Sequence, residues 1–287
     1  MKLLVGGSGG QVGRALVAEA PAGWTVIAPP ESEFDVTDPA AARRWLADAR
    51  PTALANVAAY TAVDRAETEA EIAERINAHA AGLLAAAAAE AGVRFVHVST
   101  DFVFDGLACR PIPPEATPAP LGIYGATKLA GERAVAAADP DALVLRTAWV
   151  YAAVGNNFPR TMLRVMAERD EVRVVADQVG TPTHAAGLAR AIFRLLGAGA
   201  TGLHHWTDAG VASWYDFAVA IQEEALGLGL LDRPVPVIPI RTEDYPTPAR
   251  RPAYSVLDKT ATWAITGPAR HWRVELRDCL AEMKETA

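Results

Sequence analysis

A tyrosine and a lysine stand four residues apart in the segment Tyr124-Gly125-Ala126-Thr127-Lys128. In a helix, this spacing places both side chains on one face. A nearby ammonium favours the phenolate, so Lys128 would lower the pKa of Tyr124 from about 10 toward neutral pH. A phenol tuned in this way can donate a proton to a carbonyl oxygen while a hydride arrives at the carbon. The pair predicts a carbonyl reductase, with chance pairing on a helix surface as the alternative, because the spacing is common.

A hydroxyl group that could assist this acid comes earlier in the chain. Ser99, Thr100 and Asp101 follow the segment Arg94–Val98, which is typical of a strand. Ligands bind at the carboxyl ends of parallel strands in open α/β sheets. We therefore expect a hydroxyl group of this segment to hold a substrate carbonyl beside the Tyr124 phenol.

A glycine-rich segment near the start of the chain is suited to a dinucleotide. Residues 7–13 have the sequence GSGGQVG, which follows a strand and opens a helix. Glycines Gly7, Gly10 and Gly13 let the backbone turn tightly and approach a pyrophosphate. The free N–H groups of the helix N-terminus then favour the negative charge. The alternative is a glycine-rich turn that holds no ligand.

The second predicted strand should end at the cofactor's adenosine ribose. It ends in Ala28-Pro29-Pro30-Glu31, and no Lys or Arg occurs between residues 22 and 38. No residue of that stretch can pair with a 2′-phosphate, and Arg14 is the nearest basic candidate. The cofactor can therefore be NADPH or NADH.

The elements that must position these residues alternate between strand and helix. We predict strands at Lys2–Val5, Trp24–Ala28, Ala53–Ala58, Arg94–Ser99 and Ala142–Thr147, and helices at Gln11–Ala20, Pro39–Ala49, Glu67–Glu90 and Tyr124–Ala138. Asp38 is a natural N-cap before Pro39, and Gly92 closes the long helix. This alternation implies parallel strands joined by right-handed crossovers. The predicted fold class is a Rossmann-type, doubly wound α/β sheet.

The second half of the chain has a different character. Prolines cluster between residues 234 and 252, and the strand and helix signals there are short. We predict an NAD(P)-binding domain over residues 1–150. Residues 151–287 would form mainly a smaller α/β substrate lobe, and some of this chain could return to the first domain.

Composition excludes several classes of protein. Of the 287 residues, 51% are apolar, which is enough for a sizeable core. Lys and Arg number 27 against 34 Asp and Glu, a net charge of −7, so we expect no nucleic-acid partner. Two isolated cysteines and the adjacent His204 and His205 do not match a disulfide framework or a metal site. With no signal peptide and no apolar run of about 20 residues, we predict a cytoplasmic protein without a membrane partner.

Taken together, these motifs resemble the dTDP-4-dehydrorhamnose reductase family of the extended short-chain dehydrogenases/reductases. The resemblance runs nearly end to end. The matching segments are GQVG (10–13), DVTD (35–38), AAYTAVDRAE (58–67), VSTDFVFDG (98–106), YGATKLAGE (124–132), RTAWVY (146–151), GNNF (155–158), DQVGTPT (177–183) and RRPAYSVLD (250–258).

This resemblance implies an activity. The family reduces the C4 keto group of dTDP-4-dehydro-L-rhamnose to dTDP-L-rhamnose with NAD(P)H. A reductase of another dTDP-4-keto-6-deoxysugar is one alternative. A non-catalytic regulatory subunit of the methionine adenosyltransferase type is another, although an intact Thr100, Tyr124 and Lys128 argue against it. The partner would be a dTDP-linked keto-deoxysugar, and a homodimer is compatible with the resemblance.

The resemblance also implies roles for individual residues. Those expected to contact the cofactor are Gly7, Gly10, Gln11, Val12, Asp35, Val36, Ala58, Ala59, Tyr60, Tyr124 and Lys128. Thr100 and Asp101 would hold the sugar, and Trp149 would pack against the deoxysugar or its carrier. Asn157 would touch the diphosphate or cap a helix, and Arg251 would contact a phosphate or order the proline-rich loop.

Two departures from the family pattern stand out. Some relatives bind magnesium at a dimer interface through an acidic residue on the first helix, where this chain has Arg14 and Ala15. We therefore expect no metal. The C-terminal motif usually carries Asn where this chain has Tyr254, which affects a substrate contact and not the class of reaction.

Overall fold

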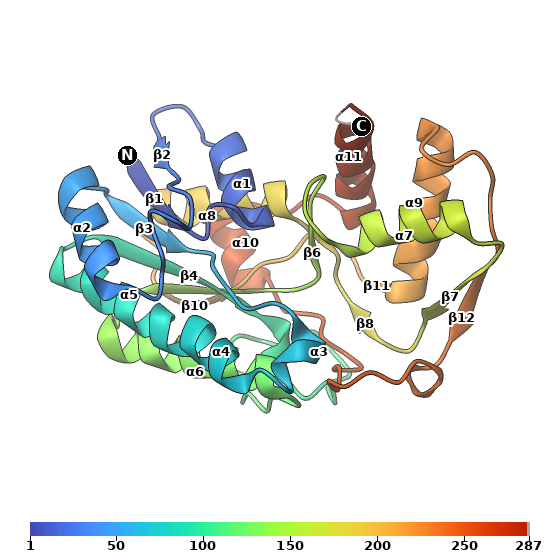
Figure 1. The fold of residues 1–287 in the computed structure, drawn as a ribbon, viewed down its shortest axis with the longest axis horizontal. Coiled ribbons are helices and arrows are strands. Elements are labelled where there is room, and N and C mark those ends of the chain that lie inside the picture. The colour runs from blue at the N-terminus through green and yellow to red at the C-terminus, as the bar shows by residue number, and fades with distance from the viewer. Residues whose placement is uncertain (286–287) are drawn as a thin grey trace.

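The computed structural model describes residues 1–285. Within that range, six parallel strands form one sheet in the order β10-β5-β4-β3-β1-β2 (Figure 1). The strands are β1 (Lys2–Gly6), β2 (Thr25–Ile27), β3 (Ala53–Asn56), β4 (Arg94–Thr100), β5 (Leu143–Thr147) and β10 (Gly202–His205). The predicted Rossmann-type α/β class is confirmed. Because β1 leads to β2 on one side and β3 lies on the other, the sheet has a topological switch point beside β1.

Both faces of this sheet are covered by helices, as the apolar strands require. Leu3 and Val5 point to the face covered by α1 (Gln11–Ala18) and α8 (Ala185–Gly197). Leu4 points to the face covered by α2 (Pro39–Ala49), α5 (Ala80–Glu90) and α6 (Ile123–Ala138). Alternate residues of one strand are thus buried on opposite sides, which explains the continuous apolar runs.

The chain returns to this sheet after it has entered the second lobe. Strand β10 pairs with β5 in parallel, and α8 packs against α1. Residues beyond Tyr151 therefore supply an edge strand and a covering helix of the first domain.

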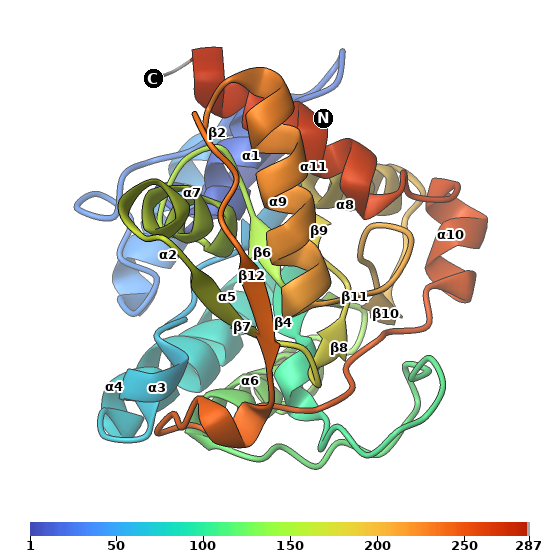
Figure 2. The same ribbon diagram turned by 90° about the vertical axis from the view of Figure 1, so that its right-hand side faces the viewer.

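The second lobe has its own core, built from three helices and short strands. Helices α7 (Phe158–Glu168), α9 (Trp214–Leu228) and α11 (Trp272–Glu285) enclose residues such as Met166, Phe217 and Leu276. Strands β7 (Val172–Val175) and β12 (Val237–Ile240) pair in parallel beside α9 (Figure 2). The remaining elements are α3 (Val63–Ala66), η2 (Asp101–Val103), β6 (Val150–Tyr151), β8 (Val179–Gly180), β9 (Thr183–His184), β11 (Ala212–Ser213), η3 (Thr242–Asp244) and α10 (Thr260–Thr266).

The long helix predicted over Glu67–Glu90 differs in detail. The structure has α4 (Ala70–Glu74), a π-helical turn η1 (Arg75–His79) and then α5. Glu67 lies before the helix, where its Oε1 accepts a hydrogen bond of 2.8 Å from the backbone N–H of Ile123. The carboxylate thus stabilises the N-terminus of α6, where free N–H groups attract negative charge.

Among the described residues, no helix is both long enough and apolar enough to span a bilayer.

Candidate active site

Tyr124 and Thr100 meet at the carboxyl edge of the sheet. Thr100 is the last residue of β4, and Tyr124 lies in the first turn of α6. The Thr100 hydroxyl neighbours the Tyr124 hydroxyl, and the Tyr124 ring packs edge-on against Phe102 with centroids 5.4 Å apart. Desolvation raises the pKa of Tyr124 to about 12, and the neighbouring Thr100 hydroxyl opposes part of that rise. At neutral pH Tyr124 therefore carries the proton that a general acid must donate.

Lys128 is on the same helix but turns into the protein. Its Nζ donates to the Val98 carbonyl oxygen at 2.7 Å and lies 3.2 Å from His97 Nε2. Burial lowers the pKa of Lys128 to about 8. The expectation that Lys128 lowers the pKa of Tyr124 is wrong for this conformation, because the Tyr124 pKa is raised and the Lys128 amino group faces β4.

Two buried polar atoms beside this pair have no partner among the described residues. Asp101 is 2% exposed; its Oδ1 accepts from Thr100 at 3.1 Å, while Oδ2 has no hydrogen bond of normal geometry. Burial raises the pKa of Asp101 to about 6, and the neighbouring Ser255 and Thr100 hydroxyls oppose part of that rise. The Thr147 hydroxyl is also unpartnered, and Thr147 pairs in register with Thr100 across β5 and β4. Buried polar groups are normally hydrogen-bonded, so these two unpartnered atoms mark this edge of the sheet as unusual. Sequence reasoning missed Thr147, although its place at the end of a predicted strand was a usable signal.

The glycine loop has the close approaches that a dinucleotide site needs. Gly7 has φ = +88°, and a Cβ there would lie 2.5 Å from the backbone nitrogen of Ala58. A Cβ on Gly13 would lie 2.4 Å from the Gly7 carbonyl oxygen. Gly10 is the N-cap of α1 and supplies no side-chain cap, so the first N–H groups of the helix stay free for an anion. The loop fits a pyrophosphate, with Gly10, Gln11 and Val12 at the helix N-terminus.

The other predicted cofactor residues follow β2 and β3 at the same edge. Asp35 Oδ1 accepts from the Thr37 backbone at 2.8 Å and so forms a tight turn. Val36 packs over Gly6. Ala58 and Ala59 follow β3 directly, and the Tyr60 hydroxyl donates to Glu69. The Tyr60 backbone is held on both sides by the side chain of Asn77, through its Oδ1 at 2.8 Å and its Nδ2 at 3.2 Å, so Asn77 satisfies backbone groups.

The predicted substrate residues of the second lobe have clear local partners. Trp149 has the left-handed φ of 48° and stacks on Trp214 with centroids 3.6 Å apart. Asn157 is the N-cap of α7, where its side chain accepts from the backbone of Arg160. Arg251 forms a bidentate ion pair with Asp64, at 2.8 and 3.1 Å, and so ties the proline-rich loop to α3. The structure places Asn157 and Arg251 in structural contacts, and their contact with substrate stays a prediction.

Comparison with known proteins assigns the chain to a family. The family described as the RmlD substrate binding domain matches residues 1–285. The chain belongs to this family. It is 42% identical to a dTDP-4-dehydrorhamnose reductase of Burkholderia thailandensis, over 99% of each chain. It is 44% identical to one of Mycolicibacterium smegmatis, over 98% of this chain and 85% of the relative.

Solved structures agree with this assignment. A dTDP-4-dehydrorhamnose reductase from Clostridium acetobutylicum superposes with a TM-score of 0.92 at 39% identity, over 99% of this chain and 100% of that one. One from Bacillus anthracis, in complex with NADP, has a TM-score of 0.91 at 33% identity, over 98% and 99%. The resemblance inferred from the motifs is thus confirmed.

A buried ion pair fixes the helix that carries Tyr124 in this member of the RmlD family. Glu132 of α6 receives two hydrogen bonds from Arg146 of β5, at 2.6 and 2.8 Å, and a third at 2.5 Å from Ser99 of β4. Arg146 is 2% exposed and also lies over the Phe104 ring. Moving α6 away from β4 and β5 would separate this pair and leave uncompensated buried charges, which is strongly unfavourable. The pair therefore holds α6 against these two strands. Sequence reasoning did not identify this pair, because no short-range pattern links the three residues.

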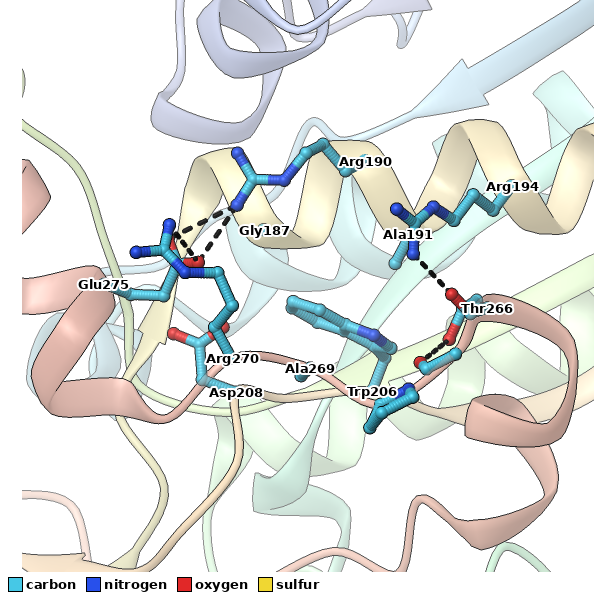
Figure 3. Close-up of a pocket in the computed structure, with 12 residues that line it drawn as sticks. Gly187, Arg190, Ala191, Arg194, Trp206, Asp208, Thr266, Ala269, Arg270 and Glu275 are labelled. Carbon is cyan, nitrogen blue, oxygen red and sulfur yellow. Dashed lines mark hydrogen bonds and ion pairs between the residues drawn. The ribbon is translucent and has the colours of Figure 1, made fainter.

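A small polar pocket of this RmlD-family fold lies between α8 and the segment that leads into α11 (Figure 3). Its volume is about 110 Å³, and α8, the segment of Asp208 and the start of α11 line it. Arg190 and Arg270 both pair with Glu275, at 3.1 and 3.3 Å. Asp208 is 1% exposed, and within residues 1–285 its Oδ1 has no partner. Burial raises the pKa of Asp208 well above its usual range. No group of three or more His, Cys, Asp or Glu side chains in the described part of the chain could hold a metal ion.

Proposed function

We propose that this protein reduces the C4 keto group of dTDP-4-dehydro-L-rhamnose to dTDP-L-rhamnose with NADPH or NADH. The observation that carries the proposal is the Tyr124–Thr100 hydroxyl pair at the carboxyl edge of a Rossmann-type sheet. Full-length similarity to enzymes named dTDP-4-dehydrorhamnose reductase supports the choice of substrate. A related structure in complex with NADP supports the choice of cofactor.

The residues present divide the work of the reaction. The loop from Gly7 to Gly13 would hold the pyrophosphate at the N-terminus of α1. When bound, the reduced nicotinamide supplies a hydride. Thr100 orients the C4 carbonyl oxygen, and Tyr124 donates a proton to that oxygen. Asp101 and Thr147 offer buried polar atoms for the hydroxyl groups of the sugar.

The remaining roles belong to the same proposal. Lys128 would bind the nicotinamide ribose after its side chain turns from β4. Trp149, stacked on Trp214, would present an aromatic surface to the sugar or its carrier. A cytoplasmic location, a homodimer and the absence of a metal stay predictions.

A direct absorbance assay of the cofactor tests the proposal. The purified protein is mixed with dTDP-4-dehydro-L-rhamnose and NADPH or NADH, and loss of the nicotinamide band is followed with product identification. We expect turnover with the dTDP-linked sugar and far slower turnover with the free 4-keto sugar, because remote binding energy positions the reacting carbon. Cofactor binding without turnover would instead favour a non-catalytic role. Equal rates with the free sugar would show that the substrate class is wrong.

A further inference from the structure

Three buried side chains form a continuous hydrogen-bonded row behind Tyr124. Asn56 at the end of β3, His97 in β4 and Lys128 in α6 are each at most 1% exposed. Asn56 Nδ2 lies 3.1 Å from His97 Nδ1, and His97 Nε2 lies 3.2 Å from Lys128 Nζ. The row therefore connects the active-site lysine to a residue on the third strand.

The orientation of the Asn56 amide is decided by the backbone. Asn56 Oδ1 accepts a hydrogen bond of 3.2 Å from the N–H of Ala58. The opposite orientation would set an amide NH₂ against that N–H donor. The NH₂ group of Asn56 therefore faces His97, and His97 Nδ1 must be an acceptor.

The state of His97 follows from this assignment. Burial lowers the pKa of His97 well below its usual range, so the imidazole is neutral. A neutral imidazole carries one proton, and with Nδ1 as acceptor that proton is on Nε2. His97 thus presents an N–H donor to Lys128 Nζ.

An ammonium group has donors only, so it fits poorly against this N–H. A neutral amine can accept from His97 Nε2–H through its lone pair while it donates to the Val98 carbonyl oxygen, as the 2.7 Å contact requires. Of the charged groups around Lys128, Glu132 favours the ammonium, but Arg146 holds both of its oxygens. Tyr124, one turn earlier on α6, is protonated and exerts no charge.

We propose that His97, oriented by Asn56, is a positioning residue that favours the neutral amine of Lys128 over the ammonium while this side chain rests against β4, so that Lys128 loses its proton more readily there. When the Lys128 amine takes up a proton, its side chain is favoured to turn away from His97, toward the carboxyl edge of the sheet where the cofactor would bind. The pair thereby couples the charge of Lys128 to its availability for cofactor and for Tyr124. This inference rests on the proposed reductase function only for its effect on rate.

The tautomer of His97 can be measured without any activity. Nitrogen-15 NMR of the protein labelled at its histidines distinguishes protonated from unprotonated ring nitrogens, and the signals of His97 among the six histidines are those lost in His97→Gln. We expect His97 to be the Nε2–H tautomer at pH 7. An Nδ1–H tautomer or a doubly protonated ring would overturn the proposal, whatever the assay of the enzyme shows.

The pH dependence of kcat/KM tests the consequence for Lys128. In the unaltered protein we expect an alkaline limb near pH 8, where Lys128 loses its proton. The carboxylate of Asn56→Asp would accept a hydrogen bond from Nδ1–H, which leaves Nε2 as an acceptor and favours the ammonium, so the limb should move up by about one pH unit. His97→Gln, whose amide oxygen can face the ammonium, should move it in the same direction and serves if Asn56→Asp does not fold.

A matched control keeps a structural effect apart from this one. His204, in the edge strand β10, is hydrogen-bonded to the Thr262 hydroxyl and the Thr201 carbonyl oxygen. His204→Gln therefore makes the same replacement outside the row. We expect its alkaline limb to stay in place. A lower rate in His97→Gln with an unmoved limb would mean that His97 serves packing alone and would refute the proposal. Absence of turnover in the unaltered protein would instead refute the reductase function, with the tautomer still decided by NMR.

Discussion

Asn157 donates a hydrogen bond of 2.9 Å to the side chain of Gln11, 146 residues earlier in the chain. Gln11 is the first residue of α1, at the end of the glycine loop, and Asn157 is the N-cap of α7 in the second lobe. A Cβ on Gly155 would lie 3.2 Å from the Gln11 side chain, so the two loops approach closely. The predicted cofactor loop is thereby attached to the lobe that should hold the sugar.

Asn157→Ala should lower the free energy of unfolding by about 1–2 kcal/mol, because it removes an N-cap and the contact with Gln11. Gln11→Ala removes only the contact between loops and should cost less. Chemical denaturation of both variants measures the difference. Equal losses would show that the cap at Asn157 contributes nothing.

Tyr124→Phe should reduce turnover by a factor on the order of 10²–10⁴, the usual worth of a general acid. Cofactor affinity should stay near normal, because the ring still packs against Phe102. Steady-state kinetics and cofactor titration by fluorescence check both points. Tyr245→Phe, at a tyrosine that is 60% exposed, is the matched loss of a hydroxyl and should leave turnover unchanged. Retained turnover in Tyr124→Phe would remove Tyr124 from the role of acid.

We expect at most a modest preference for NADPH over NADH. Residues 23–37 contain no Lys or Arg, and Arg14 Nε is engaged with the Gly9 carbonyl oxygen at 3.0 Å. The ratio of kcat/KM for the two cofactors is the measurement. A ratio above roughly a hundredfold corresponds to about 2.7 kcal/mol of 2′-phosphate recognition. That result would contradict the prediction, and Arg14→Ala would then show whether Arg14 supplies the contact.

Asp208→Asn should stabilise the protein at pH 7. Burial raises the pKa of Asp208 in the folded state, so folding favours its protonated form. The stability contributed by this group therefore falls as the pH rises above the unfolded value of about 3.9. An Asn side chain stays neutral and its oxygen can still accept from the backbone of His184, as Asp208 does at 2.8 Å.

Thermal unfolding of Asp208→Asn and the unaltered protein at pH 4 and pH 7 tests this sign. The gain in Tm should be larger at pH 7 than at pH 4. Asp170→Asn, at a carboxylate whose side chain is 97% exposed, is the control and should show little change at either pH. A variant at Asp208 that is less stable at pH 7 would mean that the ionised carboxylate is the stabilising form.

Exhaustive chelation should leave both activity and assembly unchanged. The first helix carries Arg14 and Ala15 where magnesium-binding relatives have an acidic residue, and Tyr124 already supplies the proton. Activity and molecular mass are measured before and after treatment with a chelator. A loss that added Mg²⁺ restores would reveal a metal site that these residues did not indicate.

Local features of the chain were sufficient to predict the fold class and the order of the motifs. Strand and helix periodicities are short-range properties, so the alternation over the first 147 residues indicated a parallel sheet, and strand ends placed Thr100 at its ligand-binding edge. The i, i+4 spacing likewise placed Tyr124 and Lys128 on one helix.

The direction of the Lys128 side chain and the proton affinities of the site could not be predicted in the same way. Lys128 faces His97, 31 residues away in sequence, and Glu132 is neutralised by Arg146 from another strand. A pKa depends on desolvation and on the groups that face a side chain, and both arise only when remote segments pack together. For that reason the sequence indicated a lysine beside a tyrosine, whereas the tertiary structure decided that this lysine is buried against an imidazole.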